Sequence, residues 1–288
     1  MLFVLSPAKT LDYERPLPRG VRQRATEPLF VPRAAELIGL LSRLDPPEVA
    51  QLMDLSDELA HLNVGRYAAW RPAHDHGNSR PAVMAFNGDV YDGLDARSLT
   101  GADLTWAQAH LVILSGLYGA LRPMDLLQPY RLEMGTRLAN AHGKDLYAYW
   151  GDTVAEYLSQ RLAEDRQPVL VNLASQEYFK VADRAALTAP PGPDCAQPAP
   201  RGGRGNLGRP GVSSKARVVE CVFEDWKAGQ YKIISFFAKR ARGAMARWAI
   251  QHRVRSVKAL QAFDADGYAF DPAASATDRL VFRRQLAD

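Results

Sequence analysis

The sequence predicts a mixed α/β (α+β) fold, a single compact domain with a central mixed sheet flanked by helices. Short apolar runs that end in small polar residues recur along the chain, and helical stretches alternate with them. This pattern is typical of strands and helices interleaved in one domain. The 288 residues are 47% apolar and 24% charged, which is enough to bury a sizeable core. Because we find no internal repeat, we assign residues 1–288 to one domain.

Four apolar runs predict buried strands. They read "LFVLSPAK" from Leu2, "LVILSGLYG" from Leu111, "PVLVNLAS" from Pro168 and "YKIISF" from Tyr231. A short continuous apolar run is typical of a strand that is buried on both faces. Each run delivers polar groups at its C-terminal end, and in α/β sheets such ends commonly line a cleft.

Helical patterns alternate with these runs. They cover Ala34 to Arg43, Pro46 to Ala69 with a break near Ser56, Asp103 to His110, Thr153 to Glu164, and Ala238 to Val254. Within residues 44–70 we expect a helix pair, in which Pro46 and Pro47 open a short helix and Ser56 or Asp57 caps the next one. Such a pair can hold backbone N–H groups against phosphates, although an ordinary packed helix pair fits the same sequence.

Residues 188–217 are rich in Pro, Gly and Arg and have almost no large apolar side chains. We predict a disordered insertion there, because such a segment contributes little to a core. Gly203, Gly205 and Gly208 spell G-x-G-x-x-G inside it, but the dinucleotide fingerprint needs a strand before it and a helix after it. We therefore expect no nucleotide-binding loop in this segment.

Several classes of protein are disfavoured by missing signals. The two cysteines, Cys195 and Cys221, match no metal spacing and fit a reducing compartment. The N-terminus lacks a signal-peptide pattern, and no run approaches the ~20 apolar residues of a membrane span. The "HDH" tripeptide from His74 to His76 fits a polar surface loop better than a metal site. We expect a cytoplasmic protein that binds no membrane, no metal and no other cofactor.

Positive charge is concentrated in the C-terminal third of the chain. Residues 1–200 carry 19 basic and 24 acidic side chains, whereas residues 201–258 carry 14 basic and three acidic ones. The stretch 227–258 has nine Lys or Arg and no Asp or Glu. A local excess of one sign indicates a binding site for an anion rather than general solubility.

The helix expected from Ala238 carries this charge on one side. At 100° per residue, one side of the helix is basic and the opposite side is apolar. The basic side holds Lys239, Arg240, Arg242, Arg247 and Arg253, and the apolar side holds Ala241, Ala244, Met245 and Trp248. A helix face with basic residues alone lacks the stabilising ion pairs that opposite charges form at i, i+4. This lack favours a polyanionic partner that would balance the charge. Nucleic acid is our first interpretation; the alternatives are an exposed face that binds nothing specific and an anionic membrane surface.

Polar side chains gather at the predicted strand ends. A Lys beside carboxylates is suited to acid–base or nucleophilic chemistry, and Arg can clamp a phosphate, so the candidate catalytic residues are Lys9, Arg131, Glu133 and Glu177. The other residues expected to line the cleft are Ser6, Asp89, Ser115, Tyr118, Tyr130, Asn172 and Ser175. The alternative is that Arg131, Glu133 and Glu177 form internal ion pairs.

Seven colinear segments carry a family resemblance. They are "SPAKTLDY" from Ser6, "GDVY" from Gly88, "SGLYGALRPMDLLQPYRLEMG" from Ser115, "GKDLY" from Gly143 with "WGD" from Trp150, "NLASQEYFK" from Asn172, "YKIISFFAKRARGAMAR" from Tyr231 and "GYAFD" from Gly267. On these segments the chain resembles the UPF0246 (DUF328) family of YaaA peroxide stress proteins. The resemblance runs nearly end to end and leaves out the segment at about 188–217.

The resemblance implies survival under hydrogen peroxide through lowered free iron, and DNA binding through a helix-hairpin-helix element and a positively charged cleft. By position the hairpin corresponds to Pro46 to Ala69. Together with the helix face, it implies DNA contacts at Lys9, Arg66, Lys180, Lys232, Lys239, Arg240, Arg242 and Arg247. One position departs from the family pattern, because Asn87 stands before "GDVY" where a Lys is expected.

The resulting expectation is a non-enzymatic, cytoplasmic protein of the peroxide stress response. It should bind duplex or distorted DNA with little sequence specificity, mainly by phosphate contacts, and have no obvious protein partner. Because no cluster of His, Cys and carboxylates resembles an iron store, we expect any effect on iron to be indirect. The alternative is an enzyme acting on a nucleotide or nucleobase, in which Lys9 and Arg131 hold phosphate and Glu133 or Glu177 moves protons.

Overall fold

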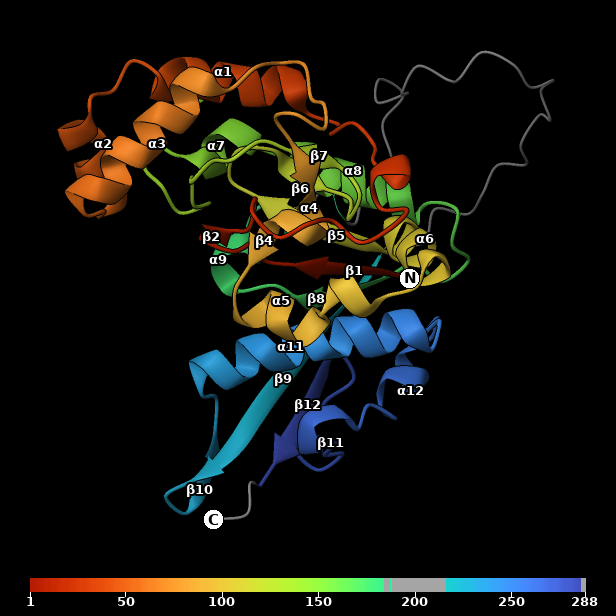
Figure 1. The fold of residues 1–288 in the computed structure, drawn as a ribbon. Coiled ribbons are helices and arrows are strands. Elements are labelled where there is room, and N and C mark those ends of the chain that lie inside the picture. The colour runs from red at the N-terminus through yellow and green to blue at the C-terminus, as the bar shows by residue number, and fades with distance from the viewer. Residues whose placement is uncertain (184–186, 188–215, 286–288) are drawn as a thin grey trace.

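The computed structural model describes residues 1–183, 187 and 216–285. It confirms the mixed α/β fold, with a large sheet through the middle of the molecule and helices packed around it (Figure 1). Five neighbouring strands are parallel, in the order β12 (Arg279–Arg284), β9 (Arg217–Lys227), β8 (Val169–Leu173), β1 (Leu2–Leu5) and β5 (Leu111–Ser115). Strands at the borders are antiparallel to their neighbours, namely β6 (Gly119–Leu121), β11 (Ala269–Phe270) and β10 (Gln230–Lys232).

Three of the four predicted strands are confirmed as β1, β5 and β8, which lie side by side at the centre of the sheet and are buried along their whole length. In the register, Val4 lies opposite Val112 on one side and Asn172 on the other. The polar residues that follow β1 and β8 therefore emerge next to each other at one edge of the sheet, as parallel strands require.

The buried strand predicted from Tyr231 is wrong. Only Gln230–Lys232 is a strand, and it forms the exposed half of a hairpin with the end of β9. Ile233 is 56% exposed, and helix α11 begins at Ser235. The apolar residues of "YKIISF" thus belong to a border strand and to the start of a helix. A short apolar run does not reveal whether it forms such elements or a buried core strand.

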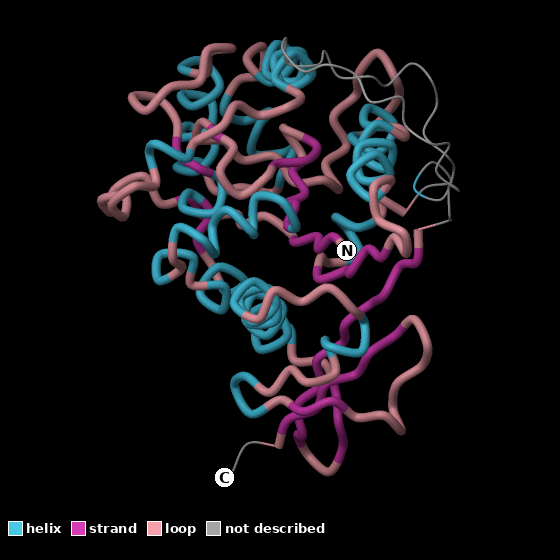
Figure 2. Tube along the Cα trace, turned by 90° about the vertical axis from the view of Figure 1, so that its right-hand side faces the viewer, coloured by secondary structure: helices cyan, strands magenta, loops and turns pink. Residues whose placement is uncertain are grey.

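Strands β9 and β12 were missed because charged residues interrupt their apolar patterns. The charges are paired across the two strands, since Arg283 of β12 contacts Glu224 at 2.9 Å and Arg284 contacts Asp225 at 2.7 Å. Figures 1 and 2 show these strands running from the centre of the molecule toward the end where the C-terminus lies.

The helices lie close to their predicted positions. Those bearing on the sequence analysis are α1 (Val31–Leu41), α2 (Pro46–Met53), α3 (Asp57–Ala69), α6 (Gly101–His110), α8 (Thr153–Leu162) and α11 (Ser235–Gln251). Shorter helices are α4 (Ala82–Ala85), α5 (Asp89–Leu94), α7 (Leu146–Trp150), α9 (Gln176–Phe179) and α12 (Val257–Leu260). The remaining pieces are 3₁₀ turns at Arg22–Arg24, Ala96–Ser98 and Ala265–Gly267, and the strand pairs β2 (Thr10–Leu11) with β4 (Phe86–Asn87) and β3 (Arg80–Pro81) with β7 (Leu126–Leu127).

The predicted helix pair is confirmed as α2 and α3, which project at the top left of Figure 1. Asp45 and Glu48 form a reciprocal capping box at the start of α2. Ser56 caps α3 by accepting a hydrogen bond from the Leu59 N–H at 3.4 Å. The structure establishes the pair and its caps, and its identity as a helix-hairpin-helix DNA motif stays a prediction.

Helices α5 and α11 cross at close range, and two glycines allow it. A Cβ on Gly243 of α11 would lie 1.7 Å from the Val90 carbonyl oxygen, and one on Gly93 of α5 would lie 2.0 Å from the Arg240 carbonyl oxygen. α11 also packs against β9 and is seen end-on in Figure 2. This crossing fixes where the side chains of α11 stand relative to the start of α5.

Two predictions lie outside the described residues. They are residues 188–215 of the predicted disordered insertion, with its glycine motif, and the state of Cys195; the other cysteine, Cys221, is free and buried in β9. At residues 216–217 the predicted disorder is wrong, because Ala216 is buried and Arg217 begins β9, paired with Val169 of β8. Within the described ranges, none of the helices combines the length and apolar composition needed to cross a bilayer.

Candidate functional site

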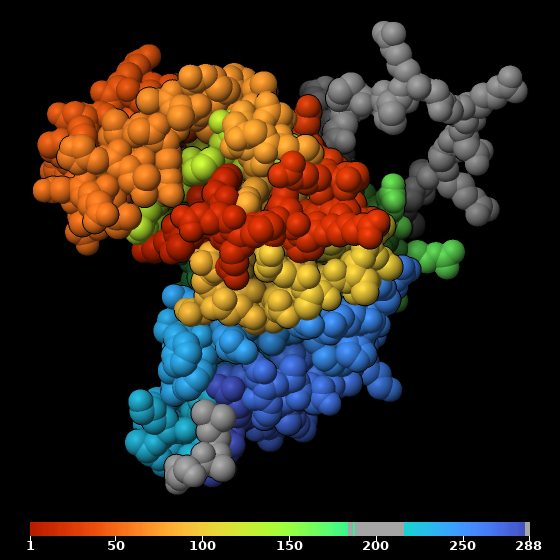
Figure 3. Space-filling model, in the orientation of Figure 1, coloured from red at the N-terminus to blue at the C-terminus, as the bar shows by residue number. Residues whose placement is uncertain are grey.

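A cavity of about 370 Å³ lies where β1 and β8 end. Five parts of the chain form it: the segment after β1, the start of α5, the segment after β7 that holds Glu133, the segment after β8, and one face of α11. On the face shown in Figure 3, the N-terminal segment, α5 and α11 follow one another from top to bottom. The lining residues are Ser6, Pro7, Ala8, Lys9, Thr10, Asn87, Gly88, Asp89, Val90, Glu133, Ser175, Glu177, Tyr178, Lys239 and Arg242.

Two serines join the strand ends at the cavity. The Ser6 hydroxyl accepts a hydrogen bond from the Ser175 N–H at 2.9 Å and donates one to the Ser175 hydroxyl at 3.3 Å. The Tyr91 hydroxyl donates a hydrogen bond to the Ser6 carbonyl oxygen at 3.0 Å. The polar residues that follow β1 and β8 are therefore held in one place, as the sequence predicted.

Lys9, Glu133 and Arg131 form a chain of ion pairs at one side of the cavity. The Lys9 Nζ lies 2.9 Å from Glu133 Oε2, and the Arg131 Nη2 lies 3.1 Å from Glu133 Oε1. Arg131 is outside the lining, and its buried Nε has no hydrogen-bond partner among the described residues. The expected alternative of internal ion pairs thus holds for Arg131 and Glu133, while the Lys9 side chain stays 63% exposed.

Glu177 is placed differently from Glu133. Its Oε1 accepts a hydrogen bond from the Gly135 N–H at 2.9 Å, and it makes no ion pair within the described part of the chain. Asp89, at the start of α5, has neither a hydrogen bond nor an ion pair among the same residues. Two carboxylates of the lining are therefore free to accept hydrogen bonds.

Lys239 and Arg242 reach the cavity from α11. Neither makes a hydrogen bond or an ion pair in the ranges that the structure describes. Arg242 is partly buried, and this burial lowers the pKa of its guanidinium, although the negative charge of Glu220 acts in the opposite direction. The helical projection placed Arg242 outward together with Lys239 and Arg240; in the structure those two are exposed, whereas Arg242 is partly buried at the cavity.

The other basic residues predicted to contact DNA are spread over the molecule. Arg240 pairs with Asp266 at 3.3 Å, and Arg247 donates to the Asp95 carbonyl at 2.9 Å and to its carboxylate at 3.1 Å, where α5 ends. Three of them lie outside α11. Arg66 donates a hydrogen bond to the Asn63 side chain at 3.3 Å, and the Lys180 Nζ lies 4.4 Å from the Tyr147 ring centroid. Lys232 is exposed on β10. Arg253 is outside the helix, with φ 53°, and pairs with Asp103.

Four residues predicted to line the cleft lie elsewhere. Ser115, Tyr118 and Tyr130 form a buried cluster in which Ser115 and Tyr130 share a 2.6 Å hydrogen bond and the Tyr118 N–H donates to the Ser115 hydroxyl. Asn172 accepts a hydrogen bond from the Ala174 N–H inside the core. β5 turns directly into β6, so its polar end is covered by the protein itself.

Several lining residues were missed by the sequence analysis. Tyr178 contributes a buried ring, and burial raises the pKa of its hydroxyl well above the ordinary value. Thr10, Gly88 and Val90 also line the cavity. All four lie inside strand-end segments that the sequence analysis quoted, although it did not assign them to the cleft.

The structure gives no sign of a metal site in residues 1–183, 187 and 216–285, where no three His, Cys, Asp or Glu side chains are grouped to hold an ion. The "HDH" tripeptide lies in a loop. His74 packs against Trp70 and Tyr118 and shares a 3.0 Å hydrogen bond with the Tyr118 hydroxyl, whereas His76 is exposed. This agrees with the interpretation of a surface loop.

Comparisons with known proteins agree over nearly the whole chain. A protein-family model described as "Peroxide stress protein YaaA" matches residues 1–194 and 208–274; the gap falls inside the predicted insertion. A UPF0246 protein of Leptothrix cholodnii is 62% identical over 288 residues and is covered completely, as is this chain. UPF0246 proteins of Paracidovorax citrulli and Bordetella pertussis are 58% and 55% identical over 287 residues, again with full coverage of both chains.

Proposed function

This chain belongs to the YaaA family of peroxide stress proteins, and from that premise we propose that it binds DNA at the mouth of the strand-end cavity. In this proposal it acts in the cytoplasm, contacts mainly phosphates, and limits peroxide damage to the bound DNA. Its effect on free iron is indirect, because the described residues hold no metal-binding cluster.

The observation that carries the proposal is the pair of unpartnered cations on α11. Lys239 and Arg242 have no hydrogen bond or ion pair within the described residues, and they stand at the same cavity as the exposed Lys9. A desolvated guanidinium without a partner is costly in free energy, and a phosphate would supply the missing acceptors in a bidentate geometry. Together with Lys9, which pairs with Glu133 but stays 63% exposed, these two cations suit the backbone of a nucleic acid.

The helix pair is a weaker place for phosphates. Asp57 and Glu58 lie in the first turn of α3, and Asp54 ends α2 just before it. Carboxylates at a helix N-terminus already satisfy the positive end of the helix dipole. They would also repel phosphates. We therefore assign DNA contacts first to the cavity mouth.

Titrations of duplex, single-stranded and branched DNA at several salt concentrations test the proposal. Each phosphate neutralised contributes about −0.9 to the slope of log K against log salt on duplex DNA. Contacts from Lys9, Lys239 and Arg242 should therefore produce a slope near −2.7, steeper if other cations join. Undetectable affinity at low salt, or an affinity independent of salt, would sink the proposal.

A second candidate is an enzyme acting on a nucleotide or nucleobase in the same cavity. It is favoured by the cavity volume, about 370 Å³, and by the position at strand ends, where α/β enzymes commonly have their sites. Glu177 would be the proton carrier, since it lacks an ion pair among the described residues. The test is turnover in a screen of nucleotides, abolished by Glu177→Gln without loss of the folded state.

A further inference from the structure

We propose that the strand-end cavity receives one unstacked nucleobase of the bound DNA, while the phosphates stay on its rim. The inference rests on the proposed function, because it assumes that DNA lies across the mouth of the cavity. It starts from the charge of the lining, which contains three basic residues, Lys9, Lys239 and Arg242, and three acidic ones, Asp89, Glu133 and Glu177. A site for phosphate alone would not include so many carboxylates.

The free carboxylates suit the edge of a base. Glu177 keeps one oxygen unbonded beyond its contact with the Gly135 N–H, and Asp89 has both oxygens unbonded among the described residues. Ionised carboxylates only accept hydrogen bonds. Amino and imino N–H groups of nucleobases donate them, and Asp or Glu pairing with such donors is a known form of base recognition.

The remaining lining completes a base-sized site. The Ser175 hydroxyl accepts from Ser6 and keeps its own proton, so it can donate to a carbonyl or ring-nitrogen acceptor of a base. The largely buried ring of Tyr178 forms an apolar wall. At about 370 Å³, the cavity falls near the lower end of the usual range for small-ligand sites, roughly 300–1,000 Å³.

An exposed phenylalanine lies about one helical turn before Lys239, a residue of the cavity lining. Phe236 is 52% exposed and lies three residues before Lys239 on α11, so the two side chains are neighbours on the helix surface. Proteins that extrude a base or kink DNA commonly insert an apolar side chain between base steps. We assign this role to Phe236, which would fill the space that the extruded base leaves in the stack.

Fluorescence of 2-aminopurine placed in a mismatched pair of a DNA duplex tests the inference. The fluorescence of this base is quenched while it is stacked, so we expect a several-fold rise when the wild-type protein saturates the duplex. Phe236→Ala should remove most of the rise, and Ala8→Phe, which puts a ring into the cavity, should remove it as well. Trp226→Ala is the matched control, since Trp226 is an aromatic residue that is 42% exposed near the end of β9 and does not line the cavity, and it should leave the rise unchanged.

The outcomes separate this inference from the proposed function. Salt-dependent binding without any rise in fluorescence overturns the inference and leaves DNA binding intact, whereas absence of binding overturns both. A free nucleoside monophosphate that binds the wild type but not Ala8→Phe, while the duplex stays quenched, assigns the cavity to a small molecule and also overturns the inference. If Ala8→Phe does not fold, Phe236→Ala at an exposed position still decides it.

Discussion

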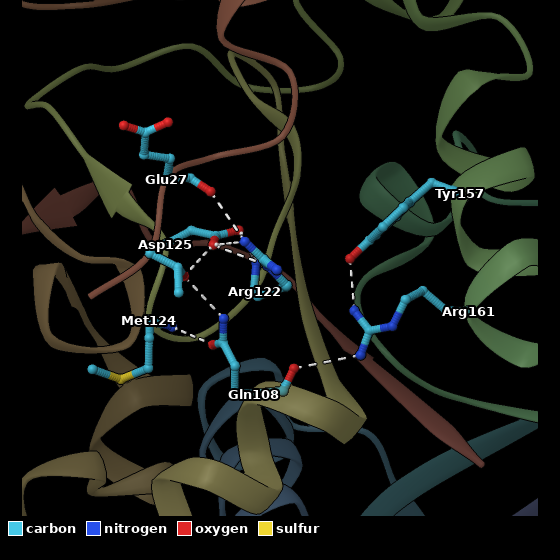
Figure 4. Close-up of polar contacts among 8 residues, drawn as sticks. Glu27, Gln108, Arg122, Met124, Asp125, Tyr157 and Arg161 are labelled. Atoms are coloured by element: carbon cyan, nitrogen blue, oxygen red, sulfur yellow. Dashed lines mark hydrogen bonds and ion pairs between the residues drawn. The ribbon is translucent and has the colours of Figure 1, made fainter. Parts of the chain in front are cut away.

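Two clusters of arginine and carboxylate in this protein have similar chemistry but opposite pairing. The first surrounds Asp125, which is fully buried. Figure 4 shows it together with Arg122, Gln108 and Glu27. Arg122 donates to both carboxylate oxygens of Asp125, from Nη2 at 2.7 Å and from Nε at 3.0 and 3.2 Å, and also to the Glu27 carbonyl at 3.1 Å. Thr26 donates its hydroxyl to the same carboxylate at 2.6 Å.

The second cluster is the cavity, where Arg242 and Glu177 have no ionic partner in the described ranges. Burial lowers the pKa of Arg242. For Arg122 burial acts in the same direction, but hydrogen bonds to Asp125 outweigh it and raise the pKa. A charged group that the fold has paired holds elements together, whereas one left unpaired at a cavity is available to a ligand.

The largest expected effect comes from breaking the paired cluster. Asp125→Ala leaves a partly buried guanidinium without its carboxylate, which should lower the free energy of unfolding by about 3 kcal/mol. Urea unfolding followed by circular dichroism measures it. Asp264→Ala, at an exposed position without a partner among the described residues, should change it by less than about 0.5 kcal/mol. Equal stability of the two variants would contradict a structural role for the Asp125 cluster.

The next effect concerns the close crossing of α5 and α11. Gly243→Ala would place a Cβ 1.7 Å from the Val90 carbonyl oxygen, so α5 and α11 must separate, at a cost of about 2 kcal/mol. DNA affinity should fall as well, because Lys239 and Arg242 shift with the helix. Gly65→Ala is the control in α3, where a Cβ meets nothing within 4 Å, and it should raise stability by about 0.5–1 kcal/mol. A tolerated Gly243→Ala would mean that the helices cross less tightly.

Replacing the two arginines alike compares the clusters directly. Arg242→Met keeps most of the aliphatic chain and removes an unpaired, desolvated charge, so stability should be unchanged or slightly higher. DNA affinity should fall about tenfold, corresponding to about 1.4 kcal/mol. Arg122→Met should do the reverse, lowering stability and leaving the affinity of the folded protein intact. Thermal melts and DNA titrations on both variants measure the two effects. If both variants lost stability and affinity to the same extent, the two clusters would not differ in role.

The smallest expected effect is a pH dependence at a third paired carboxylate, Asp103. Burial alone would raise its pKa, but hydrogen bonds from Thr100 and Arg253 outweigh burial and lower the pKa below the ordinary value of 3.8. The ionised form therefore stabilises the fold above that value, and this stabilisation is lost as the pH falls through the folded pKa. Asp103→Asn should cost about 1 kcal/mol at pH 7 and less near pH 3. A constant difference in urea midpoints across that range would rule out this linkage.

Much of the fold and part of the site followed from local patterns. The apolar runs from Leu2, Leu111 and Pro168 became β1, β5 and β8 because continuous apolar stretches bury themselves in parallel sheets. Pro46 and Ser56 marked the helix pair through capping chemistry that acts within one turn. The polar residues after β1 and β8 met at one sheet edge, as their positions at the strand ends predicted.

The tertiary structure alone decided which charges are paired. Ion pairs such as Arg283 with Glu224 join residues far apart in the sequence. Their charged residues interrupt the apolar patterns of β9 and β12, so these two strands could not be recognised from the local sequence. The helical projection placed the basic residues on one face of α11, but only the tertiary structure shows that Arg242 lines the cavity, that Arg247 is bound to Asp95, and that Arg253 lies outside the helix. Periodicity records which side of a helix a residue occupies, whereas pairing depends on what another part of the chain places against that side.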